Sequence, residues 1–131
     1  TGQTEQEESR LKEISKSIKV VKKSNFSIGF EMLLNMIDAC LRSDPVQIEI
    51  FEKHHINKKD SPSGTAIELK KYMESKCEKQ INIHSIREGD EKGEHLIRFM
   101  FKQEILEIKH NVLSRQAFVE GCVKEVENLL Y

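Results

Sequence analysis

The stretch that decides the fold covers residues 52–66 and reads Glu52-Lys-His-His-Ile-Asn-Lys-Lys-Asp-Ser-Pro-Ser-Gly-Thr-Ala66. Just before it, apolar and polar residues alternate over 46–50, which is the period of a half-buried strand. Just after it, apolar residues recur at helical spacing, at Leu69 and Met73. The stretch is therefore predicted to be a polar loop between a strand end and a helix start, where binding and catalytic groups are commonly placed.

The second half of this stretch is typical of an anion site. Ser63, Gly64 and Thr65 are expected to open the helix, so that the free backbone N–H groups of its first turn point outward at the positive end of the helix dipole. Gly64 would let a ligand approach the backbone closely. The run is not a phosphate-binding P-loop, because no lysine follows the glycine.

The first half of the stretch adds charge and proton-transfer groups. His54 and His55 titrate near neutral pH and suit proton transfer, while Lys58 and Lys59 add positive charge. Clustered cations would also lower the pKa of histidine and lysine side chains here. The pattern indicates a site for a small anion, with a carboxylate the favoured ligand, at which a proton is moved. A solvated basic loop with a helix cap would give the same spacing, so the spacing leaves both interpretations open.

These residues form a motif that resembles a known one. The dihydrodipicolinate reductase family has a substrate-site motif similar to the string His54-His55-x-x-Lys58-x-Asp60-x-Pro62-Ser63-Gly64-Thr65-Ala66, with alanine in the usual place of Ser61. The resemblance implies NAD(P)H-dependent reduction of 4-hydroxy-tetrahydrodipicolinate to tetrahydrodipicolinate, a step of diaminopimelate and lysine biosynthesis. It also implies site roles: His54 as the acid/base residue, Lys58 as the proton donor, His55 and Arg115 on the substrate, and Gly64 and Thr65 on a substrate carboxylate.

Two further passages are similar to turns that contact the nicotinamide cofactor, NADPH or NADH, in that family. Thr1-Gly2 matches the end of a Gly-Thr-Thr-Gly turn, and Ser24, Asn25 and Phe26 belong to an Asn-Phe-Ser-x-Gly turn. The Gly-rich dinucleotide fingerprint does not occur in these 131 residues. We therefore expect a fragment that lacks most of the nucleotide-binding half, and that binds the cofactor weakly and is inactive by itself.

Hydrophobic periodicity predicts the remaining elements. Helices are expected from a capping box at Thr4 onward, and over 29–42, 63–76 and 114–130. Strands are expected over 19–23, 46–52, 81–87, 94–102 and 104–112. The predicted fold class is α+β, a mixed open sheet of about four strands with helices on one face, plus remnants of a Rossmann domain. The resemblance divides the chain into a nucleotide-domain remnant (1–26), a substrate-binding and oligomerisation domain (27–113) and a returning helix (114–131).

Composition excludes several classes of function. The net charge of −1 gives no reason to expect nucleic acid, and no apolar run is long enough to predict a membrane span. Three widely spaced cysteines form neither a zinc pattern nor a disulfide framework, which suits a reducing cytoplasm.

Two other functions remain open at this point. A metal-dependent hydrolase would use His54, His55 and one of His84, His95 or His110, but the His-Glu-x-x-His pattern is missing and no metal is expected. A non-catalytic ligand-binding or assembly module is the other alternative. A family-like passage places His95 eight residues after Arg87, and a structural role is favoured for this histidine over one in the site.

The strand expected at 96–101 is apolar on both faces. Ile97, Phe99 and Phe101 lie on one side, with Leu96 and Met100 on the other. A strand of this kind needs cover on both sides, and the predicted helices supply only one. We expect a second copy to supply the other, which agrees with the homotetramers that the resemblance implies.

Overall fold

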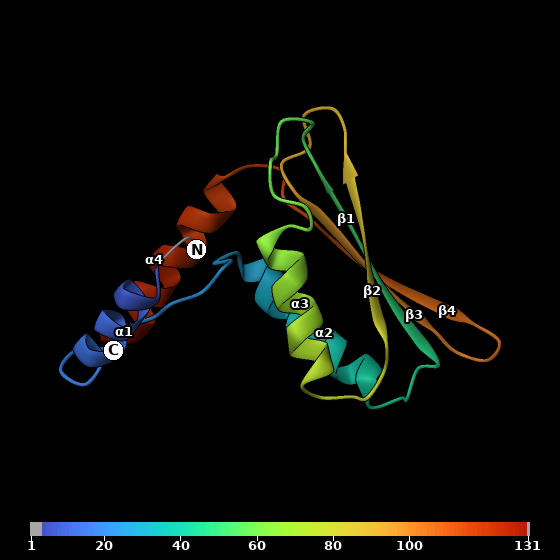
Figure 1. Ribbon diagram of the computed structural model, residues 1–131, viewed down its shortest axis with the longest axis horizontal. Coiled ribbons are helices and arrows are strands. Elements are labelled where there is room, and N and C mark those ends of the chain that lie inside the picture. The colour runs from blue at the N-terminus through green and yellow to red at the C-terminus, as the bar shows by residue number, and fades with distance from the viewer. Residues whose placement is uncertain (1–3, 131) are drawn as a thin grey trace.

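The computed structural model describes residues 4–130 and contains a two-layer body made of one sheet and two helices (Figure 1). The sheet has four strands in the order β2-β1-β3-β4. Their bounds are β1 Gln47–His54, β2 Ile81–Arg87, β3 Glu94–Met100 and β4 Ile105–Asn111. β1 pairs in parallel with β2, whereas the β1–β3 and β3–β4 pairs are antiparallel. The predicted α+β class with a mixed sheet of four strands is confirmed.

Two helices, α2 (Ile28–Leu41) and α3 (Gly64–Glu74), cover one face of this sheet. Serine caps start both of them: Ser27 Oγ accepts a hydrogen bond from the Phe30 N–H, and Ser63 Oγ accepts one from the Ala66 N–H. The core lies between the helices and the sheet and consists of buried apolar side chains, among them Phe30, Leu33, Ile37, Ile48, Ile50, Leu69, Met73, Ile81, Ile97 and Phe99.

Strand β1 is longer than the sequence predicted, because it has a partner on each side up to its end. Lys53 pairs with Glu94 of β3 and His54 pairs with Arg87 of β2. Since side chains alternate along a strand, Glu52 and His54 both point to the helix-covered face. The polar loop therefore starts at His55, and His54 is held in the sheet rather than in the loop.

The N-terminal segment differs from the prediction. Helix α1 (Glu5–Ile14) begins at the expected capping box, in which the Glu7 N–H donates to Thr4 Oγ1 and the Thr4 N–H donates to Glu7 Oε2. The strand expected over 19–23 is wrong, because no neighbouring strand in the described part of the chain is available to pair with it. Residues 4–26 thus contain one helix and no strand, and no remnant of a Rossmann sheet is seen there.

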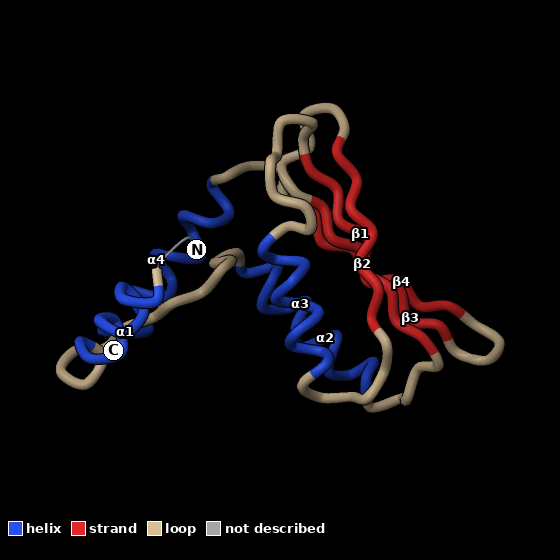
Figure 2. The backbone as a smooth tube through the Cα atoms, viewed as in Figure 1, coloured by secondary structure: helices blue, strands red, loops and turns tan. Residues whose placement is uncertain are grey.

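Helix α4 (Gln116–Leu130) leaves the body and lies to one side of it, as α1 does (Figure 2). Its closest backbone approach to the preceding segment is at Gly121, the buried residue of this helix. A Cβ added there would lie 1.5 Å from the carbonyl oxygen of Phe26, so the two backbones touch directly. Four apolar side chains of α4 remain exposed: Val119, Val123, Val126 and Leu130.

The second face of the sheet has no helix over it within residues 4–130. Phe51 stacks on the His84 ring with the ring centroids 4.6 Å apart, and the Arg98 guanidinium lies 4.7 Å from the Phe51 ring centroid. Leu96 and Met100 are half-buried beside them. This open face combines apolar and charged side chains, with Arg98 paired to Glu107 at 2.7 Å.

The three cysteines are free thiols, with Cys40 buried, Cys77 half-buried and Cys122 exposed. Each therefore lies in a different environment, and no disulfide framework holds the fold. None of the described helices has the length and apolar character needed to cross a membrane.

Candidate functional site

The centre of the site is the carboxylate of Glu52, which has no exposed surface. Its Oε1 accepts hydrogen bonds from Arg87 Nη2 at 2.7 Å and from the Ser63 backbone N–H at 3.2 Å. Its Oε2 accepts from Arg87 Nη1 at 3.0 Å and lies 2.5 Å from His54 Nδ1. One carboxylate therefore connects the ends of β1 and β2 to the start of α3.

The charges in this network follow from its hydrogen bonds. Burial by itself would raise the pKa of Glu52, but hydrogen bonds from Arg87, Ser85 and His54 lower it to about 2. For His54, burial is the largest influence and lowers the pKa; Glu52 opposes this shift, and the Lys58 and Arg87 charges add to it. The predicted direction is confirmed for this histidine, although burial rather than neighbouring cations is its main cause. At neutral pH the pair is an ionised carboxylate and a neutral imidazole.

A second buried histidine, His95, packs against the His54 ring. His95 is 3% exposed, its ring meets the His54 ring edge-on with centroids 5.4 Å apart, and its Nε2 lies 3.3 Å from Ser63 Oγ. Its Nδ1 is buried without a partner among the described residues. Burial lowers the pKa of His95 to about 3, so this ring is neutral as well.

The loop after β1 brings Lys58 toward the start of α3. Lys58 Nζ lies 2.6 Å from Asp60 Oδ1, and Arg87 Nη2 donates to the Asp60 carbonyl at 2.7 Å. The pKa of Asp60 is lowered, chiefly by its hydrogen bond with Lys58 and to a smaller extent by the Gly64 backbone N–H. Asp60 thus lies between the lysine and the helix N-terminus, the two groups predicted to hold an anion.

One hollow brings together residues that the sequence assigned to different ligands. Ser24, from the expected cofactor turn, and Gly64, from the expected carboxylate cradle, both line it. The turn itself is held rigid, since buried Asn25 accepts a hydrogen bond from the Ser27 N–H at 2.9 Å and Phe26 packs its backbone on α4. Thr65 follows Gly64 in the first turn of α3.

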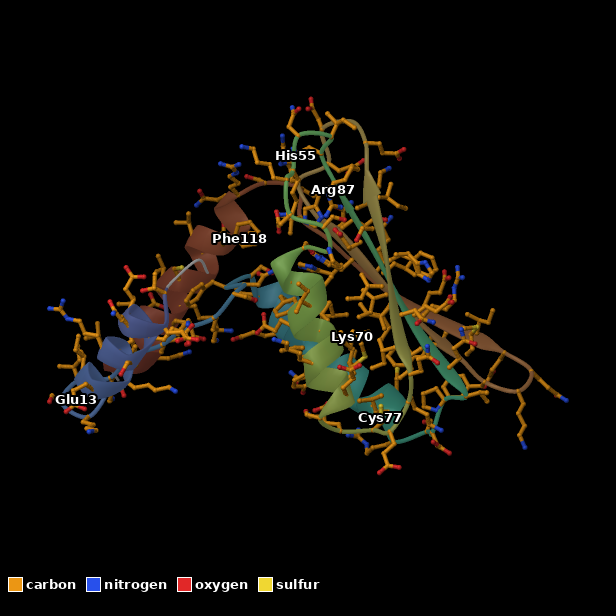
Figure 3. All side chains as sticks on the ribbon, viewed as in Figure 1. Glu13, His55, Lys70, Cys77, Arg87 and Phe118 are labelled. Carbon is orange, nitrogen blue, oxygen red and sulfur yellow. The ribbon has the colours of Figure 1, made fainter. Side chains whose placement is uncertain are left out.

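Other predicted site residues lie outside this network. His55 is half-buried, donates its backbone N–H to the Glu91 carbonyl at 2.9 Å, and lies at the same end of the sheet as Arg87 (Figure 3). Arg115 is exposed just before α4, and its side chain forms no hydrogen bond or ion pair within residues 4–130. Thr1 and Gly2 lie outside the described residues.

Two residues of this network, Glu52 and Arg87, were not predicted from the sequence to belong to the site. A signal for Glu52 was present, because it continues the period-2 alternation of Ile48 and Ile50 and places a carboxylate where an apolar residue is expected. Arg87 gave no comparable signal, since its contact with Glu52 depends on the pairing of β1 with β2. Within the described part of the chain, no three His, Cys, Asp or Glu side chains are grouped so as to hold a metal ion.

Fold and site together define a small α+β domain in which a buried carboxylate–histidine pair lies beside a helix N-terminus and a lysine. Residues 29–130 match the family model described as "Dihydrodipicolinate reductase, C-terminus". The chain belongs to this family.

Individual relatives agree with this assignment. The chain is 38% identical over 131 residues to a 4-hydroxy-tetrahydrodipicolinate reductase of Thermosipho africanus, covering 99% of the chain and 58% of the relative. It is 33% identical over 149 residues to that of Caldanaerobacter subterraneus subsp. tengcongensis, covering 99% and 59%. A solved structure, the dipicolinate-bound dihydrodipicolinate reductase of Paenisporosarcina sp. TG-14, superposes with a TM-score of 0.75 at 25% identity, over 98% of this chain and 57% of that one. The chain therefore spans little more than half the length of these relatives.

Proposed function

We propose that this chain is the substrate-binding part of a 4-hydroxy-tetrahydrodipicolinate reductase, which reduces its cyclic dicarboxylate substrate to tetrahydrodipicolinate with NAD(P)H in lysine and diaminopimelate biosynthesis. The observation that carries the proposal is the buried, hydrogen-bonded Glu52–His54 pair, placed beside Lys58 and the N-terminus of α3. The related structure from Paenisporosarcina contains dipicolinate, which is itself a planar dicarboxylate.

Each side chain has a role that its surroundings support. The first-turn N–H groups of Gly64 and Thr65 hold one substrate carboxylate, because a helix N-terminus favours an anion. Lys58 donates the proton and His54 acts as the acid/base group. His55 and Arg115 are assigned to the remainder of the substrate, since their side chains have no hydrogen-bonding partner in the described residues and are free to contact it.

The turn formed by Ser24, Asn25 and Phe26 is assigned to the nicotinamide cofactor, next to that substrate. Ser24 is exposed and shares the hollow with Gly64. Asn25 is held by its hydrogen bond with the Ser27 N–H, and the Phe26 backbone packs against Gly121 of α4. When bound, NADPH or NADH supplies the hydride for the reduction. The chain's own contribution is to hold the substrate against this turn, with Thr1 and Gly2 assigned to the same cofactor contact.

We also propose the division of labour along the chain: residues 27–113 bind the substrate and assemble the oligomer, while residues 1–26 and 114–131 belong with the nucleotide-binding half. The exposed apolar stripe of α4 supports this division, since a helix with such a stripe packs against something. The alternative, a non-catalytic binding or assembly module, predicts ligand binding without turnover even when the complete reductase is assembled.

Calorimetric titration of the chain with dipicolinate tests the proposal. We expect saturable binding, and weaker binding of pyridine-3,5-dicarboxylate, an isomer of the same charge whose carboxylates cannot reach the same two positions. NADPH is titrated in parallel and expected to bind weakly. Equal affinity for the two dicarboxylates, or no binding of either at millimolar concentration, would contradict the proposed substrate site.

A further inference from the structure

The two ring nitrogens of His54 lie in different surroundings. Nδ1 is 2.5 Å from Glu52 Oε2, on the buried side of the ring. Nε2 is on the opposite side and makes no hydrogen bond within residues 4–130. Gly93 lies on that side of the ring, since a Cβ added to it would lie 3.1 Å from Nε2 and 3.5 Å from Cδ2.

We propose that Glu52 and Gly93 are positioning residues for His54: Glu52 holds the imidazole proton on Nδ1, and Gly93 keeps the bare Nε2 open to a ligand. The inference about the ligand rests on the proposed function above. The proton position and the opening at Nε2 are properties of this chain alone.

Glu52 determines the proton position because an ionised carboxylate can only accept hydrogen bonds. Its oxygens already receive two N–H groups of Arg87 and one backbone N–H of Ser63, so the carboxylate is oriented before His54 meets it. A neutral imidazole has one N–H, and the short contact at Nδ1 requires that N–H to lie there. Nε2 is therefore left as a hydrogen-bond acceptor.

Gly93 determines access because its backbone cannot move away. Its carbonyl accepts the Val112 N–H at 2.9 Å, and the next residue, Glu94, is already paired with both β1 and β4. Its φ of +149° lies in a region that residues with a Cβ rarely adopt. A side chain at this position would cover Nε2, so the glycine leaves an opening over the ring.

This arrangement assigns different tasks to the two candidate catalytic groups. The exposed nitrogen of a neutral His54 accepts a hydrogen bond, so the ligand atom that meets it carries a hydrogen, such as a hydroxyl group or a ring N–H. Delivery of a proton to the substrate then falls to Lys58. The substrate class that fits is a dicarboxylate with a hydrogen-bond donor near its ring.

Long-range proton–nitrogen NMR correlation of the histidine rings in this chain tests the role of Glu52. We expect His54 to carry its proton on Nδ1, and Glu52→Gln to abolish this preference. Exposed His84, whose Nε2 lies 3.6 Å from Glu49 Oε1 and is therefore beyond hydrogen-bond distance of it, serves as the internal reference. Wild-type His54 with its proton on Nε2 would overturn the proposal without any need for a variant, so misfolding of Glu52→Gln cannot obscure the result.

Modification of His54 by diethyl pyrocarbonate, followed by mass spectrometry, tests the role of Gly93. The reagent attacks an unprotonated ring nitrogen, so Gly93→Ala should slow modification at least tenfold. Gly89→Ala is the matched control, since Gly89 also has a positive φ, of +56°, but an added Cβ meets nothing within 4 Å. Equal slowing in both variants, or none in either, would overturn the assignment.

The same two variants separate this inference from the proposed function. Affinity for 4-hydroxypyridine-2,6-dicarboxylate, a dicarboxylate that carries the required hydrogen-bond donor, should fall at least tenfold in Gly93→Ala and stay within twofold in Gly89→Ala. If the wild-type chain bound no dipicolinate, the proposed function would fail, while the NMR and modification experiments would still decide the roles of Glu52 and Gly93.

Discussion

Adjacent lysines in the loop after β1 have different surroundings. Lys58 is 22% exposed at its side chain and paired with Asp60, whereas Lys59 is exposed. A ligand carboxylate at this position would compete with Asp60 for the Lys58 ammonium. The contact with Asp60 shows that the Lys58 ammonium can hold a carboxylate at this place.

From this difference we expect Lys58→Ala to weaken dipicolinate binding roughly ten- to hundredfold, the usual loss for a hydrogen bond to a charged group. Lys59→Ala should change it less than twofold. In an assembled reductase, Lys58→Ala should reduce kcat by about 10²–10⁴-fold, as for loss of a proton donor. Calorimetry and steady-state kinetics measure the two effects, and similar losses in both variants would show that the motif is misassigned.

The buried ring of His95 should make the chain sensitive to acid. Its pKa is about 3 in the folded state, against about 6.5 in an unfolded chain. The folded state therefore binds fewer protons, so the stability that depends on a neutral His95 is complete above pH 6.5 and is lost as the pH falls toward 3. This residue should contribute about 1.4 kcal/mol of lost stability per pH unit below 6.5.

Urea unfolding at pH 7.0, 6.0 and 5.0 measures this loss. His95→Gln should flatten the pH dependence, whatever it does to stability at pH 7. His84→Gln, which changes a more exposed histidine on the open face of the sheet, should retain the wild-type dependence. An unchanged slope in His95→Gln would contradict the expectation.

At the scale of single residues, the motif was sufficient to find the groups that are close in sequence. His54, Lys58 and Gly64 lie within eleven positions and do meet at one end of the sheet. Arg87 and His95 come from two other strands, and their approach to Glu52 and Ser63 depends on strand register. Periodicity in one sequence does not determine that register.

Helices and strands were predictable where the apolar pattern of the segment agrees with the packing or pairing partners that the fold supplies. The four sheet strands and the capped helices have alternating or helical apolar patterns together with turn residues at their ends, and all of them form. The strand expected at 19–23 has the pattern but no partner in the described residues, and strand formation requires pairing. The extension of β1 to His54 has the opposite cause, a partner on each side.

Contact between α4 and the backbone of Phe26 leaves no room for a side chain at Gly121. Gly121→Ala would place a methyl group 1.5 Å from the Phe26 carbonyl oxygen, so the helix must move away. We expect a loss of about 2 kcal/mol or more, as for an overpacked core. Cys122→Ala, at the neighbouring exposed position, should be nearly neutral. Thermal unfolding measures both, and equal midpoints would contradict direct backbone contact.

For the whole molecule, the open face of the sheet predicts self-association. Leu96 and Met100 are half-buried there without a covering layer in residues 4–130. Light scattering on a size-exclusion column should give four times the 15.2 kDa chain mass. Met100→Lys should shift the chain toward smaller species, and Met32→Lys, at an exposed position on α2, should not. A wild-type monomer at micromolar concentration would exclude assembly through this face.

The two ends of the two-layer body lie close together. The chain enters this body at Ser27 and leaves it at Ser114, and both residues line the same hollow. A segment whose two ends meet can be spliced into a surface loop of another protein without stretching either chain. The body therefore has the topology of an insertable domain, with its two ends side by side. Its two connections to the rest of the chain lie next to each other, so we expect it to be tolerated as an inserted unit.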